Sequence, residues 1–144
     1  MGVTFISGVA PIVFIAGEHL FASNDAVKML SNDNAPMRAK EITVGTSKKV
    51  QAVRTSFDLR QYNGQDGGYS VYGQIYKNGV AVGMMRSQTS TLYITYTEDI
   101  PCQSGDLIQI YLWRTVNGNW AECRNFRLYT IPNIGFPVAS NTMV

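Results

Sequence analysis

Glycine and asparagine divide the chain after residue 40 into short stretches. This spacing of turn-forming residues limits the possible folds more than any other feature of the sequence. Within the stretches aliphatic and polar side chains alternate: Leu92 and Ile94 alternate with threonine and tyrosine residues. Alternation of this kind places the aliphatic side chains on one face of a strand, and no long stretch has the period of a helix. The pattern therefore predicts half-buried strands of antiparallel sheets.

The fold class follows from the number of these stretches and from the turns between them. Asn78-Gly79 supplies the two positive-φ residues of a tight type I′ hairpin, and Asn117-Gly118 repeats the device before the last strand. The sequence predicts an all-β fold, an antiparallel and jelly-roll-like β-sandwich of about seven or eight strands with extended N- and C-terminal arms. The expected strands cover residues 41–45, 50–60, 69–77, 80–86, 91–100, 107–115 and 120–129.

Three regions differ in composition. Residues 1–39 form an apolar N-terminal arm and linker, residues 40–131 the β-sandwich, and residues 132–144 a C-terminal tail. In the linker we expect one short helical turn over residues 26–30, with Asn24 or Asp25 as its N-cap.

Charge and hydropathy exclude several classes of protein. Only 15% of the residues are charged, the formal net charge is +2, and the basic residues are scattered, so nucleic acid is not an expected partner. The apolar residues 1–25 contain glycine, proline and polar residues, and no Lys or Arg precedes Lys28. We therefore expect neither a membrane span nor a cleaved secretory signal there.

The sequence has few residues whose spacing indicates a catalytic or metal-binding site. Cys102 and Cys123 have no CxxC spacing and no histidine nearby, which argues against zinc. They form either one disulfide or two buried thiols; the sequence leaves both open, and we favour thiols. His19 is the only histidine and belongs to no recognisable catalytic triad. We expect no catalytic residue, no metal, no cofactor and no enzymatic activity.

Three short motifs carry a resemblance to a known fold family. They are Gln-Ile-Tyr-Lys-Asn-Gly-Val at residues 74–80, Ser-Gly-Asp-Leu-Ile-Gln-Ile-Tyr at 104–111 and Asn-Phe-Arg-Leu-Tyr at 125–129. In this order they resemble jelly-roll domains of the complement-globular-domain and tumour-necrosis-factor-like type. Similar small sandwiches occur in virion spikes, turrets and head fibres. The resemblance implies a fold rather than a function.

The apolar arms suggest the main functional hypothesis. Large apolar side chains left in water forfeit about 1.5–3 kcal/mol each, so the arms must be covered, either by their own sandwich or by a neighbouring subunit. We favour the neighbour, which predicts a non-enzymatic structural protein of a virion (capsid, turret, spike or decoration component) whose partners are copies of itself and other virion proteins. The expected interface residues are Phe5, Ile6, Ile12, Val13, Phe14, Ile15, Ile134, Phe136 and Val138.

A second hypothesis makes the chain a secreted or surface-exposed module that binds a host glycan or receptor. Trp113 and Trp120 flank the second Asn-Gly pair, and Asn117 and Asn119 lie between them. These four residues provide stacking surfaces and hydrogen bonds for a sugar. The competing interpretation is simple pairing of the two tryptophans across a hairpin, which stabilises the sheet and binds nothing.

Overall fold

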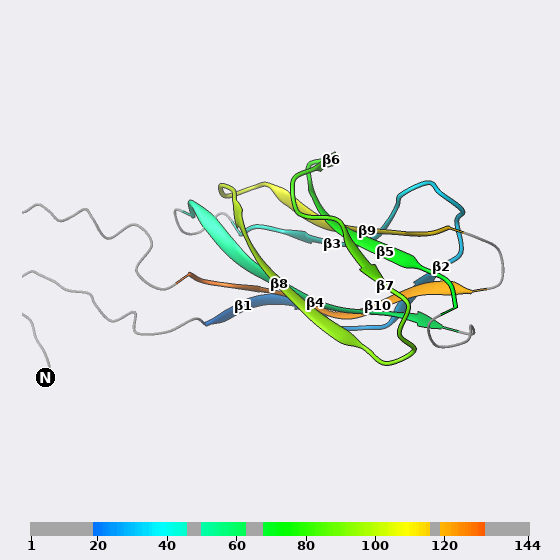
Figure 1. Cartoon of the computed structure of the whole chain (residues 1–144). Helices are drawn as coiled ribbons and strands as arrows, with labels where there is room; N and C mark the ends of the chain where they lie inside the picture. The colour runs from blue at the N-terminus through cyan, green and yellow to red at the C-terminus, as the bar shows by residue number, and fades with distance from the viewer. Residues whose placement is uncertain (1–18, 46–49, 63–67, 116–118, 132–144) are drawn as a thin grey trace, which may run out of the picture.

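Two antiparallel sheets face each other in the computed structural model, which describes residues 19–45, 50–62, 68–115 and 119–131 (Figure 1). The described residues form ten strands and contain no helix. The expected all-β sandwich is confirmed.

Strand β10 lies at the centre of the first sheet. It pairs on one side with β4 and on the other with β1 and then β2, while β8 pairs with the far side of β4. The strands of this sheet are β1 (Leu20–Asn24), β2 (Lys28–Leu30), β4 (Ala52–Tyr62), β8 (Ile94–Pro101) and β10 (Trp120–Tyr129).

Strand β9 has the corresponding place in the second sheet. It pairs with β3 on one side and with β5 on the other, and β5 pairs in turn with two short strands, β6 and β7. The strands of this sheet are β3 (Met37–Thr43), β5 (Val71–Lys77), β6 (Val80–Ala81), β7 (Arg86–Gln88) and β9 (Leu107–Arg114).

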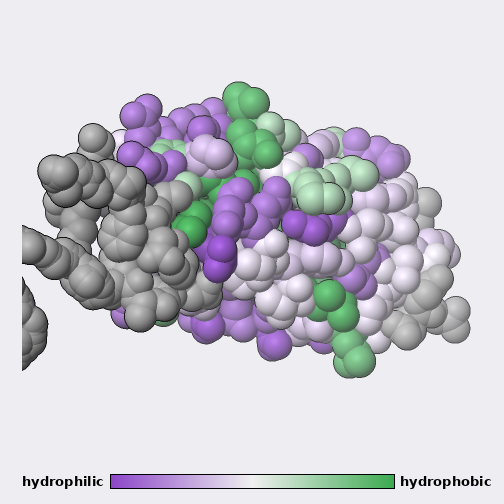
Figure 2. Space-filling view, turned by 60° about the vertical axis from the view of Figure 1, so that its left-hand side comes forward, coloured by the Kyte–Doolittle hydropathy of each residue, from purple (hydrophilic) through white to green (hydrophobic). Residues whose placement is uncertain are grey.

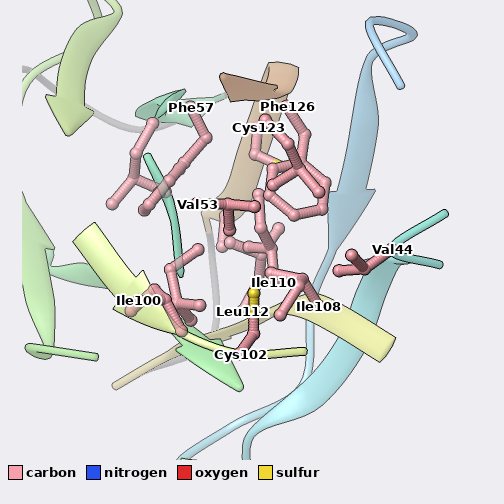
Figure 3. Close-up of a cluster of buried hydrophobic side chains, with 14 of the residues drawn as sticks. Val44, Val53, Phe57, Ile100, Cys102, Ile108, Ile110, Leu112, Cys123 and Phe126 are labelled. Carbon is pink, nitrogen blue, oxygen red and sulfur yellow. The ribbon is translucent and has the colours of Figure 1, made fainter. Parts of the chain in front are cut away.

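The core lies between the sheets and includes the aliphatic sides of the patterns in β4 and β9. Leu92 and Ile94, which alternation placed on a half-buried strand face, are exposed instead. Phe57 of β4 lies in one buried cluster with Ile110 and Leu112 of β9 (Figure 3), and these three residues and Leu59 of β4 are at most 2% exposed. Burial of side chains of this size contributes about 1.5–3 kcal/mol each. The buried hydrophobic cluster runs from Val44 to Leu128, entirely inside the described residues.

The expected helical turn near Asp25 is wrong. Residues 28–30 form β2, in which Met29 is the register partner of Glu122 in β10, and Leu30 packs against the core. Asp25 accepts hydrogen bonds from Arg127 and caps no helix. Pairing with β10 outweighs the weak local helix signal. Strands β1 and β2 and the first residues of β3 thus lie within the 1–39 segment.

The two Asn-Gly pairs have different outcomes. Asn78 (φ 52°) and Gly79 (φ 82°) join β5 to β6 in a tight hairpin, as predicted. The prediction of a second hairpin is wrong, because β9 and β10 belong to opposite sheets and the chain crosses between the layers there. Residues 116–118, which include Asn117, lie outside the described residues.

Both cysteines are free and buried, so the preference for thiols over a disulfide is confirmed. Burial raises the pKa of the Cys123 thiol to about 12. Burial also raises the pKa of the Cys102 thiol, and the negative charge of Asp106 raises it further. Both thiols are therefore protonated at neutral pH and serve as small core side chains.

The first two resemblance motifs contact each other. The Asp106 carboxylate accepts hydrogen bonds from the Gln103 backbone N–H (2.9 Å) and from Asn78 Nδ2 (3.0 Å). Asn78 Oδ1 accepts one from the Leu107 N–H at 2.9 Å. Gly105, at φ 92°, makes the turn that brings Asp106 into place. The β5–β6 hairpin is thereby fastened to the turn that begins β9.

We predict that Asp106→Ala lowers the free energy of unfolding by about 1–2 kcal/mol at neutral pH, because two donors lose their acceptor. The hydrogen bonds from Gln103 and Asn78 hold the pKa of Asp106 below its usual value. Stabilisation from a lowered pKa is present above the unfolded-state pKa and is lost as the pH falls through the folded-state pKa. The difference between wild type and variant should therefore shrink in acid.

Urea unfolding at about pH 7 and about pH 3, on either side of the ordinary aspartate pKa, measures this difference. Gln103→Ala is the matched control in the same turn, because it keeps the backbone N–H and removes only an exposed side chain. An equal loss of stability in the control would contradict the assignment.

Candidate functional site

The N- and C-terminal ends of the described sandwich are bonded to each other. The His19 N–H donates to Thr130 Oγ1 (3.0 Å), and the Thr130 N–H donates to the His19 carbonyl (2.9 Å). Leu20 and Tyr129 are register partners in β1 and β10. The two ends of the described chain, residues 19 and 131, therefore lie at one end of the first sheet (Figure 1). The nine expected interface residues all come before residue 19 or after residue 131 and lie outside the described residues.

Three of the four expected ligand-binding residues, Trp113, Asn119 and Trp120, are described, and they do not form one site; Asn117 lies outside the described residues. Trp113 is only 9% exposed, and its ring stacks on Tyr72 of the neighbouring strand with 5.4 Å between centroids. Asn119 is fully buried, where its Nδ2 donates to Gln61 Oε1 at 3.3 Å. Trp120 is exposed on the other sheet. Trp113 and Asn119 therefore support the fold, and the two tryptophans do not pair. Of the three described residues, Trp120 is the one available at the surface.

A different aromatic partner stands beside Trp120. Its register partner in β4 is Tyr62, and both side chains are more than a third exposed. The next pairs along the same outward face are Glu122 with Arg60 and Arg124 with Asp58. Polar alternation in each strand marked this face as outward, but the pairings depend on the β4–β10 register, which the sequence does not contain.

Tyr93 lies at the centre of this outward face, between two guanidinium groups. Arg60 lies 4.5 Å and Arg124 3.8 Å from the centroid of its ring. Burial, followed by a hydrogen bond with Glu122 and the charge of Glu122, raises the pKa of Tyr93 to about 12. Arg60 is paired with Glu122 and Arg124 with Asp58, so this tyrosine–arginine cluster balances its own charges.

This arrangement suits contact with a neutral partner better than catalysis. The exposed Trp120 and Tyr62 rings offer apolar faces with polar edges, and the neighbouring arginines and carboxylates offer hydrogen bonds. Within the described ranges no group of three or more His, Cys, Asp or Glu side chains could hold a metal ion. The first sheet therefore presents a surface on which a ring-shaped ligand could stack.

An open pocket of about 390 Å³ lies at the other end of the molecule, near the paired ends of the sandwich. Lys77 Nζ donates to the Pro101 carbonyl at its edge, at 3.0 Å. The Cys102 thiol in its wall is protonated at neutral pH, so it is a poor nucleophile. The pocket is lined by Val50, Gln51, Lys77, Pro101, Cys102, Gln103 and Asp106.

Comparisons with known proteins give no family for this chain. No protein-family model matches it, and no curated protein matches it. The likeness to complement-type and tumour-necrosis-factor-like domains thus stays a prediction from three motifs. In the part of the chain that the structure describes, no helix is long and apolar enough to cross a membrane.

We predict that Glu122→Gln moves the titration of the Tyr93 phenol from about 12 towards the ordinary tyrosine value, because the neighbouring negative charge is removed. Burial still acts on the ring, so the shift is partial. The variant also loses about 1.5–3 kcal/mol of unfolding free energy, since Arg60 loses a charged acceptor.

Phenolate absorbance during an alkaline titration, together with urea unfolding, measures both effects. Glu41→Gln is the control, because Glu41 lies in the second sheet. The role assigned to Glu122 would be wrong if both variants gave the same tyrosine titration.

Proposed function

We propose that the chain is a non-enzymatic structural protein that self-assembles through its apolar terminal segments. The observation that carries this proposal is the bonding of His19 to Thr130 and the pairing of Leu20 with Tyr129. These contacts bring together, at one end of the sandwich, the two described ends next to which the apolar segments stand in the sequence. We propose that the two segments together contact neighbouring copies.

The composition of the core supports an intermolecular role for these segments. The buried hydrophobic cluster is supplied by residues 44–128, and both sheets form from strands between residues 20 and 129. The large apolar side chains at Phe5, Ile12–Ile15 and Phe136 lie outside the described residues, and we propose that they contact neighbouring copies. Coverage by neighbouring copies removes them from water without disturbing the sandwich.

A virion is the setting that we propose for this assembly, as a capsid, turret, spike or decoration component with other virion proteins as further partners. A surface with few charges and many Ser, Thr, Asn and Gln side chains is compatible with close packing of identical subunits. Arms that exchange between subunits are a recurrent way to build closed shells and filaments.

We predict that Ile12→Asp with Phe14→Asp reduces the purified full chain to a smaller oligomer or a monomer, because buried charge is costly at an apolar contact. The matched control is Thr4→Asp with Ser7→Asp, which adds the same charge to the same segment at polar positions. Light scattering coupled to size exclusion gives the masses. Near-ultraviolet circular dichroism of the Trp113–Tyr72 stack reports whether the sandwich is intact.

Equal masses for the two double variants would contradict arm-driven assembly. A monomeric wild type would also contradict it.

A second candidate function is recognition of a glycan at the cell surface or outside the cell. The specific observation in its favour is the exposed Trp120–Tyr62 pair beside the Arg60–Tyr93–Arg124 cluster. This site differs from the expected one, since it contains Trp120 but neither Trp113 nor Asn119.

We predict that, if this second function operates, Trp120→Ala loses at least tenfold in affinity for a glycan bound by the wild type, which is about 1.4 kcal/mol. Tyr69→Ala, which removes another exposed aromatic ring, is the control. Binding to a glycan array is the measurement, with the oligomer mass unchanged in both variants. Equal binding by both variants would remove Trp120 from the site.

A further inference from the structure

Each sheet of a sandwich has two edges, and three of the four edges here carry features that discourage further strand pairing. The edge formed by β1 and β2 is broken into strands of five and three residues. The edge formed by β6 and β7 has strands of two and three residues. Strand β3 contains a register shift between Arg38 and Lys40 and a further charge at Glu41. Short strands, bulges and charges are the usual protection of an open edge.

Strand β8 is the exception. It is eight residues long and pairs with β4 through eight consecutive partners without a register shift. Within the described residues its other side has no strand neighbour. Alternate backbone N–H and C=O groups of such a strand point away from the sheet, where they can pair with another strand.

Exposed apolar side chains border this edge. The connection between β6 and β7 (residues 82–85) crosses towards β8, and its Met84 N–H donates to both carboxylate oxygens of Glu98, at 2.9 and 3.2 Å. Met84 is 64% exposed and Leu92, just before β8, is 72% exposed. Figure 2 shows apolar side chains over β6 and this connection and again near the start of β8. The exposed members of this apolar border are Val80, Val82, Met84, Met85, Leu92 and Ile94.

The two acidic residues of β8 do not prevent a like-charged neighbour from approaching, because each is already paired. Asp99 accepts two hydrogen bonds from Arg54, at 2.7 and 3.0 Å. Glu98 pairs with Arg86 (3.3 Å) and holds the Met84 N–H. The rest of β8 and residues 80–85 carry no charge. The edge therefore combines a straight strand, neutralised charge and an apolar border.

We propose that β8 pairs with β8 of a second copy, antiparallel and centred on Thr97, so that two first sheets join into one continuous sheet. A second copy is the occupant that the charges favour: about this centre Asp99 faces Thr95 and Glu98 faces Tyr96 of the other copy, so no carboxylate opposes a carboxylate. Ile94 faces the buried Ile100, so no charge opposes either residue. The same two-fold axis brings residues 82–85 of the two copies together, because Met84 is held level with Glu98.

This contact is separate from the terminal segments, although it adds to the same proposed assembly. Leu20, Tyr129, Arg54 and Asp99 are successive register partners in one row across the first sheet. The described N-terminal end, in β1, thus lies three strand spacings from β8, and the described C-terminal end, in β10, lies two strand spacings from it. Each copy then has one contact through its ends and another through its side, and the two contacts can be tested independently.

Thr97→Cys in the full chain tests the register directly. Facing residues of an antiparallel pair have Cα atoms about 4.5–5.5 Å apart, within the range of about 4.4–6.8 Å that a disulfide spans. Thr97 is exposed and the two native cysteines are buried and free, so mild oxidation should join two copies through the introduced thiols alone. Thr43→Cys is the matched control, an exposed threonine that ends the edge strand of the second sheet.

We expect most Thr97→Cys chains to form a covalent dimer on a non-reducing gel and at least tenfold fewer Thr43→Cys chains to do so. Equal cross-linking of the two variants, or none in either, would overturn the β8 contact. If Thr97→Cys fails to cross-link while the wild-type mass exceeds that of a monomer, the assembly through the ends survives and the β8 contact does not. If Thr97→Cys still cross-links in the Ile12→Asp, Phe14→Asp background, the β8 contact forms without the assembly through the ends.

A charge at the same edge gives a second measurement. Met84→Lys should weaken dimerisation at least tenfold, because two copies would place two lysines at the two-fold axis, whereas Met37→Lys, an exposed methionine of β3, should not. Sedimentation over a concentration series measures the dissociation constant of each variant. Equal constants for the two variants would overturn the role of the apolar border.

Discussion

The pairing of β10 with both β4 and β1 is the interaction on which the other features of the molecule depend. It joins the last described strand to the first within one sheet. It supplies Cys123, Phe126 and Leu128 to the core. The same pairing sets Trp120 beside Tyr62 and brings the two ends of the sandwich together. Because these contacts are distant in sequence, we expect β10 to dock late in folding.

The fold class could be predicted because it depends on patterns that are local in sequence. Alternation marks the core face of each long strand, and Asn78-Gly79 determines its own turn. The pattern fails where tertiary pairing decides the structure: residues 28–30 become a strand only because β10 is beside them. The Asn117-Gly118 pair misled for a similar reason, since a turn motif does not say whether the following strand stays in the same sheet.

The candidate surfaces were less predictable, because each combines residues from strands that are far apart in the chain. Trp113 and Trp120 are close in sequence, yet the crossing between layers buries one and exposes the other. The Arg60–Tyr93–Arg124 cluster draws on three strand regions and needs the register of two pairings. The open edge of β8 is a property of strand order, which no local pattern encodes.

The bonded ends of the sandwich make its two poles different from each other. A strand of ten residues, β10, separates Trp120 from Tyr129, so the exposed tryptophan and the paired ends occupy opposite poles. A subunit anchored by its ends would hold the tryptophan pole outward, away from the anchoring layer. A peptide inserted directly after Tyr62, the register partner of Trp120, would accordingly be displayed at the pole away from that layer.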